Sequence, residues 1–339
     1  MACPRGYDFG MNFFAVLLAL LCEQLKPLRH GNAVHEAVIG WVRWTGRNFD
    51  AGREHHAGVV WGVTVLGPSL VIAAIYLAVH RFSSALALVV DVLILYFTLG
   101  FRQFSHYFTD IRDALERGDD LEARRLLSEW RHLDASELPR TELLRHAIEH
   151  SLLAAHRHVF GVFFWFIVLS TLGLGPAGAV LYRMAEFAGR YWAFKSRTLD
   201  APTNERLMQL SRRLFALIDF IPARLTATGF AIVGNFEEAV NGWRRDASLW
   251  LHPNEGIILA SAAGALGLQL GGAAPPGVTP DRSKTFESGV DAEFTGADGS
   301  TPGAEPVLGH LQSVVGLVWR SVVLWMLLLA LLTLANLLG

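Results

Sequence analysis

Long apolar runs alternate with polar stretches along this chain, and several of the runs have the length of a membrane span. Three of them cover residues 57–79, 84–100 and 308–339. An α-helix needs about 20 mostly apolar residues to cross the hydrocarbon core of a bilayer, so each run predicts a transmembrane helix. A shorter apolar run at residues 7–22 predicts a fourth, retained span. The pattern therefore indicates an all-α, multi-pass integral membrane protein whose first partner is the lipid bilayer.

Two other apolar segments are interrupted by residues that disfavour a continuous helix. The sequence G-L-G-P at 173–176 divides residues 159–183, and a proline between Asp219 and Arg224 divides residues 214–235. Proline removes a helical hydrogen bond, and irregular backbone at membrane depth needs protein or a wet cavity around it. We therefore expect re-entrant helical segments here, with 159–183 forming two half-helices that enter the membrane and return.

Basic residues are concentrated in the polar stretches 23–56, 102–158 and 184–213. The positive-inside rule places such stretches in the cytoplasm, which leaves both termini on the periplasmic side. Within 102–158, Gly118 predicts the end of one helix, and Asp119 or Asp120 predicts the start of the next. We expect this stretch to form a small cytoplasmic helical cap.

These elements divide the chain into five parts. Residues 1–101 hold the first three spans with a cytoplasmic loop at 23–56, and residues 102–158 form the cap. Residues 159–272 form the re-entrant and interfacial helices. A flexible loop rich in proline and glycine follows at 273–307, and the last span is 308–339. The loop is assigned as flexible because its composition cannot bury enough apolar surface to fold alone.

Composition narrows the possible functions. The chain has 339 residues, of which 52% are hydrophobic and 18% charged, and its net charge is −2. This balance gives no indication of a nucleic-acid partner. The two cysteines, Cys3 and Cys22, provide neither a disulfide framework nor a metal-binding spacing.

His146, Glu149 and His150 form the pattern H-x-x-E-H, in which two histidines share one face of a helix with a glutamate. This is the inverted zinc-protease pattern, but a zinc site needs a third protein ligand. The alternative is a set of interfacial or helix-capping histidines, to which His156 and His158 would also belong. We expect no stoichiometric zinc here.

Asp219 and Arg224 are ionisable residues inside an apolar segment. Charges at membrane depth are functional candidates by default, and they also serve as structural ion pairs. Both possibilities stay open. The structural one predicts that the two residues pair directly and hold the interrupted segment in place.

The sequence Pro253-Asn254-Glu255-Gly256 leads into a stretch of small residues that includes Gly264. Glycines allow a close approach of backbone to backbone or of backbone to ligand. The stretch therefore predicts a tight turn followed by a helix of small residues, used for helix packing or for ligand contact.

Taken together, these motifs resemble the adenosylcobinamide-phosphate synthase family (CobD/CbiB) and its divergent relative AmpE, over nearly the whole chain. The first motif is Ile221–Leu225 with Asp219 before it. The second is Pro253–Gly256 followed by the small residues up to Gly272, and the third is Leu181–Arg183.

The resemblance implies an inner-membrane, ATP-dependent synthase of cobalamin biosynthesis that joins a corrin-ring carboxylate to an aminopropanol-type amine. It implies ATP and magnesium as cofactors and a corrinoid intermediate, or other pathway and signalling proteins, as partners. Carried over residue by residue, it implies catalytic roles for Glu149, Asp219 and Arg224. The residues that it implies for ligand binding are Tyr182, Arg183, Pro253, Asn254, Gly256 and Gly264.

The chain departs from the family at several acidic positions. Where the family has E-S-x-x-E-N-x-x-D-G, only Glu149 stands, and Leu153 and Arg157 replace the later acids. After Arg183, the family's N-T-x-D-x-M is also absent. Other acids that could form a relocated site are Glu186, Glu205, Glu237 and Glu238. The losses favour an alternative function, a non-catalytic AmpE-like membrane sensor or modulator in envelope or β-lactamase-induction signalling.

Overall fold

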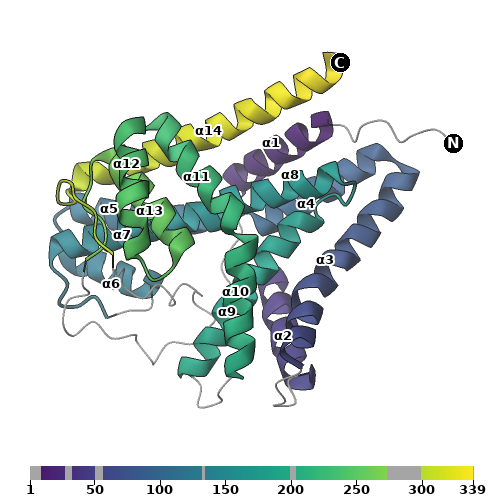
Figure 1. Ribbon diagram of the computed structural model, residues 1–339, viewed down its shortest axis with the longest axis horizontal. Helices are drawn as coiled ribbons and strands as arrows, with labels where there is room; N and C mark the ends of the chain where they lie inside the picture. The colour runs from purple at the N-terminus through teal and green to yellow at the C-terminus, as the bar shows by residue number, and fades with distance from the viewer. Residues whose placement is uncertain are drawn as a thin grey trace. The chain divides into compact units, whose positions relative to one another are not determined.

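The computed structural model describes residues 9–26, 33–49, 56–131, 134–198, 204–272 and 299–338, and most of them are helical (Figure 1). The first half contains α1 Phe9–Leu25, α2 Ala33–Phe49, α3 Ala57–Phe82, α4 Ser84–Thr98, α5 Phe101–Glu116, α6 Asp120–Arg131 and α7 Arg140–Ala155. The second half contains η2 His156–Phe160, α8 Gly161–Thr171, α9 Ala177–Thr198, α10 Glu205–Ile218, α11 Phe220–Val233, α12 Phe236–Asp246, η3 Ala247–Leu249, α13 Pro253–Leu266 and α14 Leu308–Leu338.

Three helical segments are long and apolar enough to cross a membrane. They are Ala57–Phe82, Arg140–Thr171 and Leu308–Ala335, and they become four if α10 and α11 form one interrupted span. The prediction of an all-α membrane protein is thereby confirmed. Multi-pass insertion and its orientation stay predictions.

Two of the predicted spans are shorter than a full crossing. The run at 7–22 falls in the apolar helix Met11–Leu25, and the run at 84–100 falls in Ser84–Thr98. A helix of 15 residues is about 22 Å long, whereas the hydrocarbon core is about 30 Å thick. Hydropathy therefore located these helices correctly, but each helix is shorter than the hydrocarbon core that an independent span has to cross.

One compact unit, which we call unit 1, comprises residues 1–102, 157–218 and 325–339. Helix α9 packs against α3, α8 and α10, and α1 packs against α4. In Figure 1, α9 and α10 lie side by side. Helices α2 and α3 are joined by a buried hydrogen bond of 2.7 Å from the Thr64 hydroxyl to the Thr45 hydroxyl.

The break predicted at 173–176 is present between α8 and α9. Gly173 and Gly175 adopt φ angles of 82° and 56°, a left-handed conformation that glycine adopts without strain. The two helical segments on either side of this break are longer than the half-helices that the sequence predicted. The first segment begins at Arg140 and stays helical to Thr171, because no breaking residue separates the polar helix from the apolar run.

The second compact unit, unit 2, comprises residues 103–156 and 219–324. Helix α13 packs against α7, α11 and α12, and Figure 1 shows α11, α12 and α13 together in green. The predicted boundary between α5 and α6 is confirmed: Gly118 has φ 77°, and the Asp119 carboxylate accepts a hydrogen bond of 3.0 Å from the Glu122 amide. The part of the chain predicted as a cap thus packs with the motif-bearing helices, while its cytoplasmic location stays a prediction.

Only one part of the predicted flexible loop can be compared with the structure. Residues 273–298 lie outside the described residues, but residues 299–304 are described and are ordered against 267–272. The Gln269 amide donates to the Ala304 carbonyl at 2.8 Å, and the Ala304 amide donates to the Gly267 carbonyl at 2.9 Å. Backbone pairing with a distant segment, which composition does not reveal, therefore orders residues 299–304, and the assignment of 273–307 as a flexible loop stays a prediction.

The orientation can be tested by cysteine labelling. In a background lacking Cys3 and Cys22, we expect Leu121→Cys in α6 and Gln209→Cys in α10 to resist a membrane-impermeant maleimide applied from the periplasmic side, because both residues lie in arginine-rich stretches. Both side chains are exposed, so they should react once the membrane is permeabilised. Labelling of either one in intact cells would contradict the predicted topology.

Asp91 is an ionisable residue that sequence reasoning overlooked. It lies on the buried face of α4 between Ala87 and Leu95, is 1% exposed, and makes no recorded hydrogen bond or ion pair with the described residues. A buried charge without a partner is costly. We therefore expect Asp91→Asn to keep or raise the detergent-resistant folded fraction, and Asp91→Lys to abolish it, as measured by size-exclusion chromatography after heating. A marked loss of fold in Asp91→Asn would show that the carboxylate is needed.

Candidate functional site

Asp219 lies at the break between α10 and α11. It stands immediately before the first residue of α11, at the N-cap position, and is 4% exposed. Pro222 falls in the first turn of the same helix, where a missing backbone N–H is not needed for helical hydrogen bonding. The interruption therefore starts α11 with a buried carboxylate at its N-cap.

His156 is the closest recorded partner of Asp219. Its Nε2 atom lies 2.7 Å from Asp219 Oδ1, and its Nδ1 atom lies 2.8 Å from the Thr226 hydroxyl. An ionised carboxylate only accepts hydrogen bonds, so Nε2 donates to an ionised Asp219, while the Thr226 hydroxyl can donate to Nδ1 or accept from it. His156 begins the π-helical turn η2, a type of helix irregularity that is frequent at functional sites.

Asn254 connects the two ionisable residues of the Ile-Pro-Ala-Arg-Leu motif. Its amide nitrogen donates to Asp219 Oδ2 at 3.2 Å, and its amide oxygen accepts from Arg224 Nη1 at 3.3 Å. The pair that the sequence predicted as direct is thus linked through an amide from the Pro253–Gly256 motif. We call His156, Thr226, Asp219, Asn254 and Arg224 the α11 network.

Arg224 lies at the solvent- or lipid-facing edge of this network. Its Nη1 also donates to the Phe220 carbonyl at 2.8 Å, and its guanidinium carbon lies 3.3 Å from the centroid of the Phe220 ring. The guanidinium is therefore held in place while it stays partly exposed. The two members of the expected ion pair differ in environment, with Asp219 buried and Arg224 accessible.

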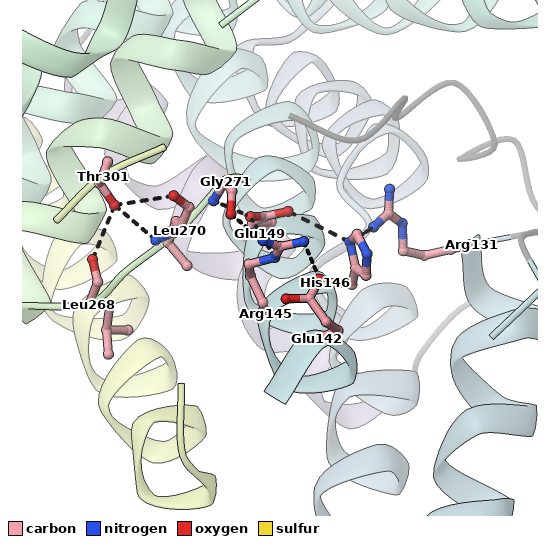
Figure 2. Close-up of polar contacts among 9 residues, drawn as sticks. All are labelled: Arg131, Glu142, Arg145, His146, Glu149, Leu268, Leu270, Gly271 and Thr301. Carbon is pink, nitrogen blue, oxygen red and sulfur yellow. Dashed lines mark hydrogen bonds and ion pairs between the residues drawn. The ribbon is translucent and has the colours of Figure 1, made fainter. Parts of the chain in front are cut away.

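Glu149, the remaining acid of the family's cap motif, anchors backbone. Its Oε1 accepts a hydrogen bond of 2.7 Å from the Gly271 amide, while Arg145 donates to the Gly271 carbonyl and also contacts Glu142. Figure 2 shows Glu149 and Arg145 side by side, both directed at Gly271. Beside them, the Thr301 hydroxyl accepts from the Leu270 amide at 2.8 Å (Figure 2). This group fixes the segment 268–271 and uses Glu149 for that purpose.

The histidines of the H-x-x-E-H pattern are buried inside unit 2 and do not lie at an interface. His146 and His150 are 3% and 2% exposed. His146 Nδ1 lies 2.7 Å from Arg131 Nη1, and the His150 ring packs edge-to-face against Trp130 with centroids 4.4 Å apart. The same aromatic group includes Tyr107, whose phenol has its pKa raised by burial and by the nearby Glu129 and Asp110.

The absence of zinc stays a prediction. Among the described residues, no group of three His, Cys, Asp or Glu side chains could hold a metal ion, and an arginine occupies the Nδ1 side of His146. We expect purified protein to contain well under one zinc per chain by elemental analysis, and we expect His150→Ala to leave that value unchanged. One zinc per chain that disappears in His150→Ala would contradict this.

The glycines of the small-residue stretch serve helix packing. A methyl group at Gly256 would overlap the Ala247 carbonyl oxygen, and one at Gly264 would overlap the Glu238 carbonyl. Pro253 is the first residue of α13, a position that suits its fixed φ angle. Of this motif, Asn254 is the residue that reaches the α11 network, and ligand contact by Pro253, Gly256 or Gly264 stays a prediction.

Tyr182 and Arg183 belong to unit 1, on α9. Tyr182 is fully buried and packs on Gly161. Arg183 Nη1 donates to Glu186 Oε2 at 2.9 Å, and Arg190 Nη2 donates to the same oxygen at 2.8 Å. Glu186, one of the acids considered for a relocated site, is thus buried between two guanidinium groups, and ligand binding by Tyr182 and Arg183 stays a prediction.

The membrane-length helical segments define an all-α membrane protein. The buried polar network, built from two sequence motifs, defines a polar site at an interrupted helix. The chain matches the model of the CobD/Cbib protein family over residues 12–286. No solved structure matches it. The chain therefore belongs to the CobD/CbiB family of cobalamin biosynthesis, and the resemblance seen in the motifs is confirmed.

Relatives within this family cover most of the chain. It is 31% identical over 324 residues to the cobalamin biosynthesis protein CobD of Stutzerimonas stutzeri, a match that covers 94% of this chain and 96% of the relative. It is 34% identical over 192 residues to a CobD of Chromobacterium violaceum, covering 56% and 57% of the two chains. It is 26% identical over 272 residues to CbiB of Salmonella typhimurium, covering 77% and 73%. Kinship to the AmpE branch stays a prediction.

Proposed function

We propose that this protein forms an amide bond between a corrin-ring carboxylate and an aminopropanol-type amine, with ATP as the energy source, in cobalamin biosynthesis. The observation that carries the proposal is the α11 network. It joins Asp219 and Arg224 of one family motif to Asn254 of another, across 35 residues of sequence. Residues that serve packing alone would not need hydrogen bonds between charged and amide side chains at the edge of an apolar segment.

The network offers two chemical functions that amide synthesis requires. An attacking amine must lose a proton, and Asp219, oriented by His156 and Asn254, is a positioned carboxylate. The carboxylate of the substrate must be held in place and its negative charge offset. Arg224 is a preoriented cation that can do both. His156 has both ring nitrogens engaged, so we assign it a positioning role.

The described residues do not form a metal site by themselves. Asp219 and Glu149 both accept hydrogen bonds from protein groups, and no cluster of three potential ligands occurs in the parts of the chain that are described. Magnesium that enters with a nucleotide needs few protein carboxylates, but no step of the proposal is assigned to a metal ion.

Complementation tests the proposal. A strain that lacks its own CobD/CbiB synthase should grow on medium that demands late cobalamin synthesis when this gene is supplied, and Asp219→Asn should reduce growth to that of the empty vector. Asp246→Asn is the matched control, since Asp246 is also a buried aspartate of unit 2 but pairs with Arg245 on its own helix. Failure of the wild-type gene, with folded protein present in the membrane, would overturn the proposal.

The alternative is the AmpE-like sensor or modulator without catalysis. One observation favours it: two acids considered for a catalytic site are used internally by backbone and arginine contacts. They are Glu149, which the resemblance implies as catalytic, and Glu186, which was considered for a relocated site. For this alternative we expect no complementation, together with altered β-lactamase induction on deletion of the gene in its own host. For either function we propose a multi-pass location in the bacterial inner membrane, with a corrinoid intermediate or a signalling protein as the partner.

A further inference from the structure

We propose that Arg320 marks the membrane boundary of α14 and binds the phosphate of an anionic lipid headgroup there. Figure 1 shows α14 as one continuous helix. A helix of 31 residues is about 46 Å long, whereas the hydrocarbon core of a bilayer is about 30 Å thick. Even at a tilt of about 40° the helix would project about 36 Å along the membrane normal. Part of a membrane-spanning α14 therefore lies outside the hydrocarbon core.

The exposed face of α14 shows which part this is, because its polarity changes at Arg320. Between residues 308 and 319 the exposed positions are mixed, and Gln312 and Ser313 are among them. From residue 323 to residue 338 every exposed side chain among the described residues is apolar. An exposed apolar face of this length suits lipid and not water. The stretch 321–338 is about 27 Å long, which matches the thickness of the hydrocarbon core.

The hydroxyl groups within 321–338 do not need water. The Ser321 hydroxyl donates to the Leu317 carbonyl at 2.9 Å, and the Thr333 hydroxyl donates to the Leu329 carbonyl at 2.9 Å. Polar groups at membrane depth have to find partners inside the protein, and bonding to the carbonyl one turn earlier provides them. This half of the helix is therefore compatible with hydrocarbon along its length.

Arg320 is directed away from the apolar half of the helix. Its Nε donates to the Gly316 carbonyl at 3.1 Å, so the side chain runs toward the N-terminal, more polar half. Long cationic side chains near the end of a span extend in this way to place their charge at the membrane surface. Trp319, the preceding residue, is 40% exposed, and tryptophan is enriched at the same depth.

The guanidinium of Arg320 keeps donors available for a ligand. Within the described residues, neither Nη atom has a recorded partner, and the sequence of α14 contains no acid and no other arginine or lysine. Guanidinium N–H groups bind phosphate oxygens with charge-assisted hydrogen bonds. A cation at this depth is attracted to a negatively charged bilayer surface. The occupant that fits both the charge and the adjoining apolar face is an anionic lipid headgroup.

Spin-label accessibility in nanodiscs tests the boundary on the full-length protein. In a background lacking Cys3 and Cys22, a nitroxide is attached to Gln312→Cys, Leu327→Cys or Leu331→Cys. We expect the label at 312 to respond mainly to a water-soluble nickel complex, and the labels at 327 and 331 to respond mainly to oxygen, which concentrates in hydrocarbon. An oxygen preference at 312 equal to that at 331 would overturn the boundary. Low responses to both reagents at 327 and 331 would also overturn it, because protein, such as a second copy of the chain, would then cover this face.

Retention of lipid tests the headgroup contact. Native mass spectrometry is applied to protein released from nanodiscs of phosphatidylcholine and phosphatidylglycerol. Arg320→Gln should weaken the affinity for the most tightly retained phosphatidylglycerol about fivefold, the effect of one cation at a membrane surface. Arg320→Lys keeps the charge but loses the fork of donors, and it should fall between Arg320→Gln and wild type. Arg117→Gln removes an exposed arginine from a stretch predicted to be cytoplasmic and should match wild type.

The headgroup contact is overturned if Arg320→Gln retains phosphatidylglycerol like wild type, or if Arg117→Gln loses as much as Arg320→Gln. Size-exclusion profiles confirm that each variant is folded before it is compared. Neither experiment involves turnover, so a failure of the proposed catalytic function would leave both results interpretable.

Discussion

Gly264→Ala is expected to leave little folded protein, although it adds a single methyl group. The methyl would overlap the carbonyl of Glu238 and would lie 2.8 Å from the Cα of Ala239. All of these atoms belong to the backbone of α12, so no side-chain rotation can relieve the clash. Helices α12 and α13 would have to separate, and overpacking of this kind costs about 3 kcal/mol or more. Unit 2 would then lose the packing that brings Asn254 to Asp219.

The measurement is the folded fraction after detergent extraction, followed by the midpoint of thermal unfolding. The matched control is Gly316→Ala in α14, where an added methyl meets nothing within 4 Å. There the better helix propensity of alanine should leave stability unchanged or raise it by up to about 1 kcal/mol. If Gly264→Ala melted like Gly316→Ala, the close approach of α12 and α13 would not be real.

Hydropathy predicted the helices of this protein well because burial in a bilayer and burial in a protein require the same apolar residues. That equivalence also explains the errors in span length. Helices α1 and α4 are apolar along their length, but they are too short for an independent crossing and pack against each other. The boundary drawn between residues 158 and 159 falls inside the continuous helix from Arg140. The first half of that helix is polar in sequence, yet residues of that half such as Glu149 and His150 are buried inside unit 2.

The site was only partly accessible to sequence reasoning. Asp219, Arg224 and Asn254 stood out because charge or amide groups interrupt apolar or small-residue stretches. Thr226 did not, and His156 was considered only as an interfacial or helix-capping histidine, since the importance of both depends on a contact across 70 residues. One signal was available for His156: it lies seven residues after Glu149, which places both on one face of a helix. Thr301 carried no such signal, because its neighbours in sequence are typical of a loop.

The different environments of Asp219 and Arg224 reverse the expectation that the two residues form a direct buried ion pair. A direct buried ion pair predicts that Arg224→Ala strands a charge and prevents folding. The structure instead places Arg224 at an exposed edge, and the buried partner of Asp219 is His156, 2.7 Å away. We therefore expect Arg224→Ala to fold normally, with its defect confined to binding and growth.

The largest loss of stability within the α11 network should come from His156→Leu. This change keeps an apolar side chain of useful volume but leaves the Asp219 carboxylate buried with one hydrogen-bond donor fewer, and removing one partner of a buried pair costs about 3–5 kcal/mol. Asp219→Asn alone should cost about 1 kcal/mol, since an amide fits the same space and can still accept from His156 Nε2.

The double variant His156→Leu with Asp219→Asn separates the cost of the stranded carboxylate from the cost of losing the histidine side chain. It removes the stranded charge, so it should be more stable than His156→Leu alone although it carries one more substitution. Thermal unfolding in detergent measures this order: wild type, then Asp219→Asn, the double variant, and His156→Leu as the least stable. If the double variant were instead the least stable, the two residues would act independently, and the coupling between Asp219 and His156 at the interrupted helix would have to be abandoned.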